Sequence, residues 1–319
     1  MSHAANDPLA IDLAGRLEAV ADRVAALRAR LAEAEREARQ AVVREAAART
    51  ELTAALTAAL LARAEAQAAA RKARWEAWRS AQRPRQGVAQ RLRARFSARA
   101  PAPALFDADW YLAANPDVAG AGRRALEHYR DLGAAEGRSP HPLFDAVFYV
   151  GEGACPDRED PLSHYLRVGW REGRSPHPLF DPDWYRAQAR DAELAPLVHY
   201  AEEGWRQGLS PHSLFDPAWY LAQNPDVAQA GAEPLAHFVS VGAGEGRSPG
   251  PWFDLPSYVA ARGAGLAAGV NPLVDYLQGG AWLVAETRPG FPTAAYLASR
   301  PELVAEGLTP LEHWARQAR

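Results

Sequence analysis

The feature that most constrains this chain is a unit of 35 to 38 residues that recurs along its C-terminal two-thirds. The spacings between successive copies are 38, 36, 35, 38 and 38 residues. An aromatic residue opens each of six copies: Phe106, Phe144, Phe180, Phe215, Phe253 and Phe291. Self-similarity at this period indicates a repeat architecture, in which neighbouring units stack to bury their apolar faces. We expect a six-copy repeat domain over residues 104–319, with copies starting near 105, 143, 179, 214, 252 and 290.

Each copy opens with residues that suit a helix N-terminus. In the clearest copy, Asp216 is a strong N-cap and Pro217 follows at the first helical position. An aromatic residue before the cap and a tyrosine five residues later are placed to form a hydrophobic staple. This pairing recurs six times, as Phe106/Tyr111, Phe144/Tyr149, Phe180/Tyr185, Phe215/Tyr220, Phe253/Tyr258 and Phe291/Tyr296.

A second short helix is predicted in every copy, usually from a Pro-Leu pair. In the fourth copy, Leu235, Phe238 and Gly242 share one helical face, and the same spacing holds in the first five copies. We expect the glycine to admit another backbone, that of the next helix. A Glu-Gly-Arg stop follows in three copies, with Gly246 an example of a left-handed cap. The repeat domain is therefore expected to be an array of short helical pairs.

Histidines recur in the repeats at two positions. One precedes the second-helix aromatic residue in five copies, and we expect it to make a local hydrogen bond to the next unit or its loop, the alternative being a histidine-lined ridge. These residues are His128, His164, His199, His237 and His313. The other lies in the proline-rich links, where a solvated side chain is expected and a metal ligand is the alternative. These residues are His141, His177 and His212.

The N-terminal region, residues 8–80, has the period of a coiled coil. Its apolar residues follow steps of four and three without a break, at Leu13, Leu17, Val20, Val24, Leu27, Leu31, Ala34, Ala38 and Ala41. A sustained heptad predicts a long helix that associates with a partner. We expect a dimer or trimer of this chain, with a solvated single helix or an intramolecular hairpin as alternatives. Glu45 interrupts the seam, and Leu52, Leu56 and Leu60 indicate a shifted register.

A basic, proline-containing tether is predicted at residues 81–103. Residues 71–100 carry ten basic side chains against one acidic side chain, Glu76. The candidates for contact with an anionic membrane or an acidic partner are Trp75, Trp78, Arg91, Arg93, Arg95 and Arg99. The alternative is a solvated linker whose tryptophans pack on the rod or the first repeat. Nucleic acid is the least favoured partner, because no recognised nucleic-acid module accompanies these charges.

A second candidate surface lies in the repeats. Aromatic faces bind sugars and cations, so tryptophans with nearby arginines are candidates for a ligand or partner surface. The residues are Trp110, Trp184, Trp219, Arg138, Arg174 and Arg247. Core packing beside the staple also accounts for the tryptophans, and capping accounts for the aspartates that would otherwise suggest calcium. No phosphate-binding loop or nucleophile motif is visible, so we expect a non-catalytic protein without a cofactor.

Cysteine usage and hydropathy bear on the compartment. The chain has one cysteine, Cys155, which rules out an intrachain disulfide and fits a reducing environment. Residues 1–11 lack the pattern of a signal peptide, and no apolar run is long enough to span a membrane. These features favour a cytoplasmic protein, with peripheral contact at the inner membrane as a further option.

The repeat pattern resembles a known family. The sequence Phe-Asp-Pro-Ala-Trp-Tyr-Leu-Ala-Gln-Asn-Pro-Asp-Val begins at Phe215, and Pro-Leu-Ala-His-Phe and Gly-Glu-Gly-Arg-Ser-Pro follow it. This order resembles tandem repeats that accompany bacterial glycosyltransferase and polysaccharide-biosynthesis domains and some cell-surface proteins. The resemblance implies an accessory module in envelope or polysaccharide production. Together with the predicted coiled coil, this leads us to expect a non-catalytic oligomerising scaffold or adaptor. A glycan-binding module and an accessory subunit of a glycosyltransferase are the alternatives.

Overall fold

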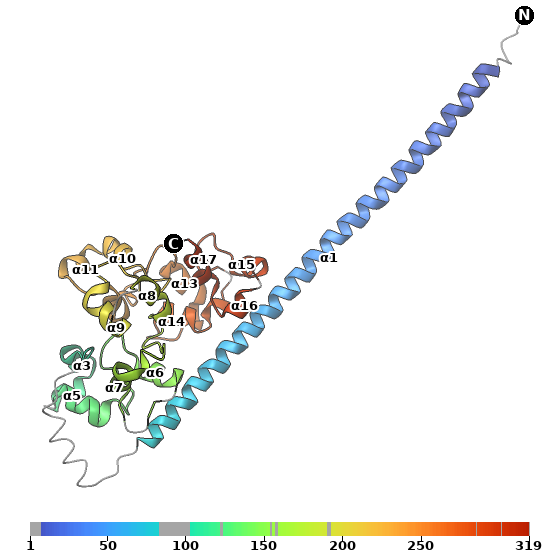
Figure 1. The fold of residues 1–319 in the computed structure, drawn as a ribbon. Coiled ribbons are helices and arrows are strands. Elements are labelled where there is room, and N and C mark those ends of the chain that lie inside the picture. Colours follow the sequence, from blue (N-terminus) through green and yellow to red (C-terminus); the bar gives the residue numbers. More distant parts are fainter. Residues whose placement is uncertain are drawn as a thin grey trace, which may run out of the picture. The chain divides into compact units, whose positions relative to one another are not determined.

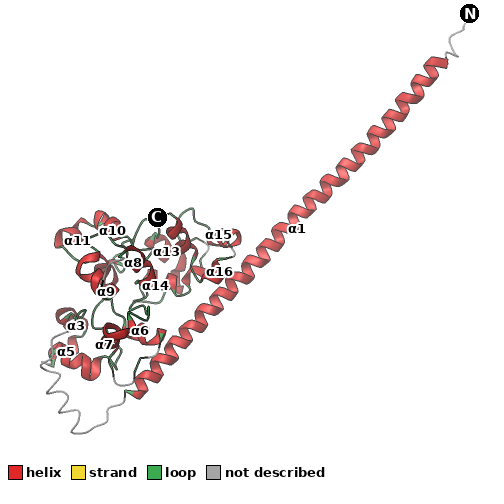
Figure 2. Ribbon diagram, in the orientation of Figure 1, coloured by secondary structure: helices red, strands yellow, loops and turns green. Residues whose placement is uncertain are grey.

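The computed structural model describes residues 8–82, 103–121, 124–153, 155–156, 159–189, 193–284, 286–300 and 302–318. Within these ranges the fold is all-α, as the sequence predicts, and Figure 2 shows helices and loops. The chain divides into two compact units, Met1–Ala55 and Leu56–Arg319. The boundary falls inside the first helix, α1 (Pro8–Ala81), so the end of the predicted rod belongs to the unit that contains the repeats.

The first unit contains the part of α1 up to Ala55. Helix formation here follows from the composition, because alanine, leucine, arginine and glutamate have high helix propensity. The predicted seam lies on the helix surface: Leu17 is 62% exposed and Leu31 is 61% exposed. Most of the stability of a protein helix comes from packing of its apolar face, and that face is uncovered in the single chain.

The second unit contains six copies of a two-part helical unit (Figure 1). Each copy begins with a short helix, in order α3 (Ala108–Ala114), α6 (Ala146–Glu152), α8 (Pro182–Gln188), α10 (Pro217–Gln223), α13 (Leu255–Arg262) and α15 (Thr293–Ser299). A further short segment follows in four copies, α4 (Pro116–Gly120), α11 (Pro225–Ala230), η5 (Gly263–Gly265) and α16 (Leu303–Glu306). The Asn-Pro steps produce α4 and α11, because the residue before a proline avoids the α region.

The predicted caps and staples are confirmed. The Asp216 carboxylate accepts a hydrogen bond of 3.0 Å from the Trp219 backbone N–H, and four other copies cap in the same way. The staple rings of Phe215 and Tyr220 lie 5.5 Å apart, and the remaining five pairs lie between 4.9 and 5.7 Å apart. Local sequence therefore fixes the start of each first helix.

The second helix of each copy is unusual in the first four copies. An α-helical turn passes directly into a π-helical turn, in α5 (Ala125–His128) with η1 (Tyr129–Gly133), α7 (Pro161–His164) with η2 (Tyr165–Gly169), α9 (Pro196–His199) with η3 (Tyr200–Gly204) and α12 (Pro234–His237) with η4 (Phe238–Gly242). The last two copies have α14 (Pro272–Leu277) with a 3₁₀ turn η6 (Gly280–Trp282), and α17 (Pro310–Gln317). A π-helical turn contains more residues than an α-helical turn, so the side chains that follow it point in other directions than they would in a regular α-helix.

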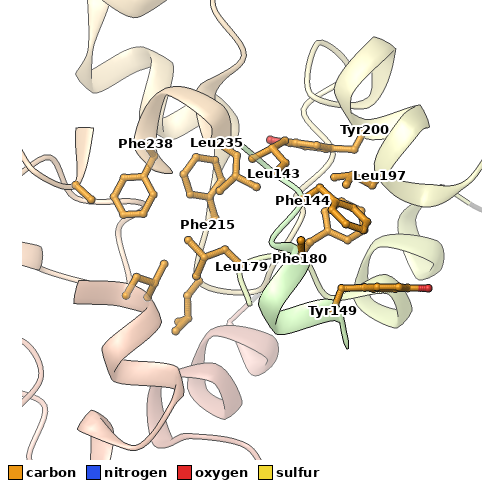
Figure 3. Close-up of a cluster of buried hydrophobic side chains, with 14 of the residues drawn as sticks. Leu143, Phe144, Tyr149, Leu179, Phe180, Leu197, Tyr200, Phe215, Leu235 and Phe238 are labelled. Carbon is orange, nitrogen blue, oxygen red and sulfur yellow. The ribbon is translucent and has the colours of Figure 1, made fainter. Parts of the chain in front are cut away.

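One continuous core joins the copies. Figure 3 shows part of it, with Phe144 and Phe180 near Tyr200 and with Phe215 near Phe238. Most of the staple aromatic residues and second-helix leucines are buried, whereas Phe106, Leu126 and Tyr296 are partly exposed. In the first four copies the cap is also tied to the link that follows it; for example, the Asp145 backbone N–H donates to the Pro176 carbonyl at 2.9 Å. Apolar burial and these repeated bonds hold the copies together.

The last part of α1 completes this unit. Trp75 and Trp78 are buried and belong to the core of the repeats, and the Trp78 indole N–H donates to the Pro156 carbonyl at 3.3 Å. Leu60 packs with Leu297 and Leu303 of the sixth copy in a separate cluster. The helix end is therefore a structural element of the repeat domain.

Candidate interaction surface

A tyrosine, a histidine and a glycine meet inside each of the first four repeats. The Tyr149 hydroxyl lies 2.6 Å from Nδ1 of His164, and a Cβ added to Gly169 would overlap that hydroxyl. The same tyrosine–histidine bond occurs in the first, third, fourth and sixth copies. The glycine therefore admits a tyrosine hydroxyl from its own copy, and the expectation of a neighbouring backbone was wrong. The histidine bonds within its own unit, which also differs from the expected contact to the next unit.

The fifth copy keeps this arrangement with different chemistry. Asp275 takes the histidine position and accepts a 2.6 Å hydrogen bond from the Tyr258 hydroxyl. Arg262 balances the added charge, with its Nε 2.8 Å from the same carboxylate. The position thus requires a hydrogen-bonding partner for the tyrosine, and imidazole is one of two solutions in this chain. The aspartate at the histidine position of the fifth copy is visible in the sequence, and it is the signal from which the tyrosine–histidine hydrogen bond could have been predicted.

The link histidines are structural as well. His177 and His212 are buried, and Nδ1 of His177 accepts a 3.1 Å hydrogen bond from the Leu179 backbone N–H. Burial lowers the pKa of His177 to about 3, so the ring is neutral in the folded protein. The expectation of solvated link side chains is wrong for these two residues. Among the described residues, no group of three or more metal-ligating side chains could hold a metal ion.

The repeat arginines of the candidate surface bind their own copies. Arg247 donates to Asn224 at 3.0 Å and to both carboxylate oxygens of Asp226, and Arg138 makes the same contacts with Asn115 and Asp117. The hydrogen bond from Arg247 lowers the pKa of Asp226 to about 2. These planar, bidentate contacts explain why arginine follows the glycine stop in copies that carry Asn-Pro-Asp.

Arg174 serves the second copy, which lacks Asn-Pro-Asp. Its guanidinium lies 4.0 Å from the centre of the Tyr149 ring and donates to the carbonyls of Tyr149 and Gly153. Internal contacts of this kind account for all three arginines of the candidate surface. They leave little reason to assign Arg138, Arg174 or Arg247 to a ligand.

The three candidate tryptophans are partly exposed. Trp184 donates to the Ser210 hydroxyl at 3.3 Å, and Arg316 lies 5.5 Å from the centre of its ring. Trp110 and Trp219 contribute backbone N–H groups to their aspartate caps, and both residues are partly exposed. Within the described ranges, no ring contact joins any two of the three. They are therefore separate exposed aromatic positions.

The tether candidates have two different outcomes. Burial of Trp75 and Trp78 in the repeat core leaves these indoles unavailable to a membrane or an acidic partner in this structure. Arg91, Arg93, Arg95 and Arg99 lie outside the described residues. None of the helices in the described part of the chain is long and apolar enough to cross a membrane.

A shallow depression of about 380 Å³ lies between the first and third copies. Asp107, Asp109 and Glu202 supply its charge, and Phe106 and Val198 supply apolar surface.

Cys155 is buried, and burial raises the pKa of its thiol to about 12. The thiol is therefore protonated at neutral pH and is a poor nucleophile.

The sixth copy packs back on earlier ones. Glu312 of α17 lies 3.4 Å from the His212 ring in the link after the third copy, and both side chains are buried. Arg316 of the same helix lies 2.6 Å from Asp181, the cap of α8. These two contacts join residues that are 100 and 135 positions apart in the chain.

Comparison with known proteins adds no relative. No protein-family model matches the chain, and no curated protein or solved structure matches it. Among the described residues, outward-facing features that could bind a partner include the seam of α1, the tryptophans Trp110 and Trp219, and the acidic depression.

Proposed function

We propose that this chain is a non-catalytic, oligomerising scaffold whose helical repeats present a surface to a partner. The exposed heptad seam of the first unit carries the proposal. Leu13, Leu17, Leu27 and Leu31 are each about three-fifths exposed on one regular stripe. Burying a leucine side chain contributes roughly 1.5–3 kcal/mol, so covering this stripe strongly favours association.

The repeat domain supplies the second half of the proposal. Its histidines, capping aspartates and stop arginines have structural tasks, so a binding role falls to its exposed positions. The resemblance of its repeat pattern to those beside polysaccharide-biosynthesis domains supports a place in bacterial polysaccharide or envelope assembly. Peripheral contact with the inner membrane through the 91–99 arginines belongs to the same proposal.

Sedimentation equilibrium tests the oligomer. The full chain is expected to have at least twice the mass of one chain at micromolar concentration. The variant Leu17→Asp/Leu31→Asp places two charges in the seam and should sediment as a monomer. Val43→Asp is the matched control, because Val43 is 67% exposed but lies off the seam. A monomeric wild-type chain, or equal effects of the two variants, would refute the proposal.

Glycan binding is the second candidate, and the partial exposure of Trp110 and Trp219 favours it. Sugar rings stack on exposed indole faces beside polar groups. Titration of tryptophan fluorescence with envelope polysaccharides tests this function. A saturable change that Trp219→Ala reduces would support glycan binding, whereas a flat titration would count against it.

A further inference from the structure

We infer that the seam of α1 pairs with a second copy of this chain in antiparallel orientation, with Leu31 opposite Ala34 of the partner subunit. The inference rests on the proposed oligomerisation and adds its geometry. It uses residues between Leu13 and Leu52, which lie in the described part of α1.

The sizes of the seam residues favour this orientation. Large side chains occupy the seam from Leu13 to Leu31, and alanines occupy it at positions 34, 38, 41 and 48. A parallel pair in register would set large residues against large ones and alanine against alanine, so its second half would bury little area. The antiparallel pair instead forms layers of even volume. Its layers include Leu17 with Ala48, Val24 with Ala41 and Leu27 with Ala38.

Glu45 also disfavours a parallel pair. It occupies a seam position and would face Glu45 of the partner subunit, so that two like charges would meet in the core. In the antiparallel register Glu45 faces Val20 instead. It also keeps its intrahelical partner, because an Arg49 guanidinium nitrogen lies 2.7 Å from its carboxylate.

The charges that flank the seam select both orientation and register. In coiled coils these flanking residues set partner choice. In a parallel pair, like charges meet at Arg23 with Arg28 and at Arg44 with Arg49. Opposite charges meet only at Arg30 with Glu35. The antiparallel pair reverses this balance, with opposite charges at Arg30/Glu37, Arg28/Glu35 and Arg16/Glu51 and like charges at Arg23/Arg44.

Neighbouring antiparallel registers place like charges opposite each other. A shift of one heptad in one direction sets Arg30 against Arg30 of the partner subunit, and a shift in the other sets Glu37 against Glu37 of the partner subunit. The proposed register avoids both. It places the two Ala55 residues, where the second units begin, about 70 Å apart along the rod.

Distances between spin labels test the orientation in the full chain with Cys155→Ala. A label at Ala32→Cys lies near the centre of the proposed pair, and a label at Ala47→Cys lies far from it. The antiparallel pair predicts an intermolecular distance under about 20 Å for the first label and about 45 Å for the second. Short distances at both positions would show a parallel pair and overturn the inference while keeping the oligomer. Absence of intermolecular distances at both would overturn both.

Charge reversal tests the register. Glu37→Arg breaks two Arg30/Glu37 pairs in the antiparallel dimer, whereas in a parallel dimer Glu37 would face Val42. We expect the dissociation constant to rise by roughly tenfold. The swapped variant Arg30→Glu/Glu37→Arg restores opposite charges and should recover the affinity. An unchanged dissociation constant for Glu37→Arg would refute the register.

Discussion

At the scale of single residues, each repeat depends on a hydroxyl that occupies the space above a glycine. Tyr149 packs on Phe144 through its ring and bonds His164 through its oxygen, so one side chain both fills the core and satisfies a buried polar group. The geometry leaves no volume for a side chain at Gly169.

Substitution of this glycine is the first test. Gly169→Ala should destabilise the second unit by about 1–3 kcal/mol, because the methyl group collides with the Tyr149 hydroxyl. Tyr149→Phe/Gly169→Ala removes the colliding oxygen and should recover part of the loss. Gly120→Ala is the control, since an added Cβ there meets nothing within 4 Å. Urea denaturation measures all three, and an equal cost for Gly169→Ala and Gly120→Ala would refute the packing.

The buried link histidine predicts a pH dependence. The pKa of His177 is lowered to about 3 in the folded protein by burial, so the unfolded chain binds a proton that the folded chain does not. The contribution of the neutral His177 ring to stability is therefore complete above the ordinary histidine pKa of about 6.5, and it is lost progressively as the pH falls below that value.

His177→Asn removes the titrating ring and keeps an acceptor for the Leu179 N–H, since asparagine forms a similar local bond two residues on. Between pH 7 and pH 5, the wild-type chain should lose about 2 kcal/mol more stability than the variant. Urea midpoints at the two pH values give the difference. Identical losses would show that His177 is accessible to protons in the folded state.

At the scale of elements, the end of α1 acts as a part of the repeat domain. The rings of Trp75 and Trp78 lie with their centres 5.3 Å apart and their planes tilted by 31°, and both residues are buried in the core. Arg74 also donates to the Gly151 carbonyl at the end of α6, and the Arg71 guanidinium lies 3.3 Å from Glu152. The helix therefore covers surface that the repeats would otherwise expose.

Removal of one indole tests this role. Trp78→Ala should cost roughly 3–5 kcal/mol of stability in the second unit, because it leaves a large cavity and removes a hydrogen bond. Lys72→Ala on the exposed side of the same helix should change stability by less than about 0.5 kcal/mol. The two variants are compared by chemical denaturation monitored by the remaining tryptophans. Similar midpoints would mean that the helix end does not stabilise the repeats.

At the scale of the whole molecule, prediction from sequence succeeds where structure is local. Caps and staples join residues three to five apart, so the residues around Asp216 specify them directly. The contact between Tyr149 and Gly169 was not predicted from the sequence. A glycine at this position indicates that space is needed but does not indicate which group fills the space. The pairing of His212 with Glu312 was not predicted, because it joins distant segments and no local sequence pattern encodes such a contact. For Trp78, packing on the rod or the first repeat was one of the alternatives, and the structure buries it in the repeat core with its indole N–H on Pro156 of the second copy.

The scaffold account makes a separate claim about the two units. The second unit buries its own core, whereas the first presents an uncovered seam and depends on a partner. Mass action then links the stability of the rod to protein concentration, while that of the repeats is independent of it.

Thermal unfolding followed by circular dichroism at 2 μM and 200 μM measures this most directly. The account predicts two transitions, with the helical transition of the rod moving to higher temperature at the higher concentration and the transition of the repeat domain unmoved. Leu17→Asp/Leu31→Asp should abolish the concentration-dependent transition, and Val43→Asp should preserve it. Transitions that coincide at both concentrations would contradict an oligomerising rod.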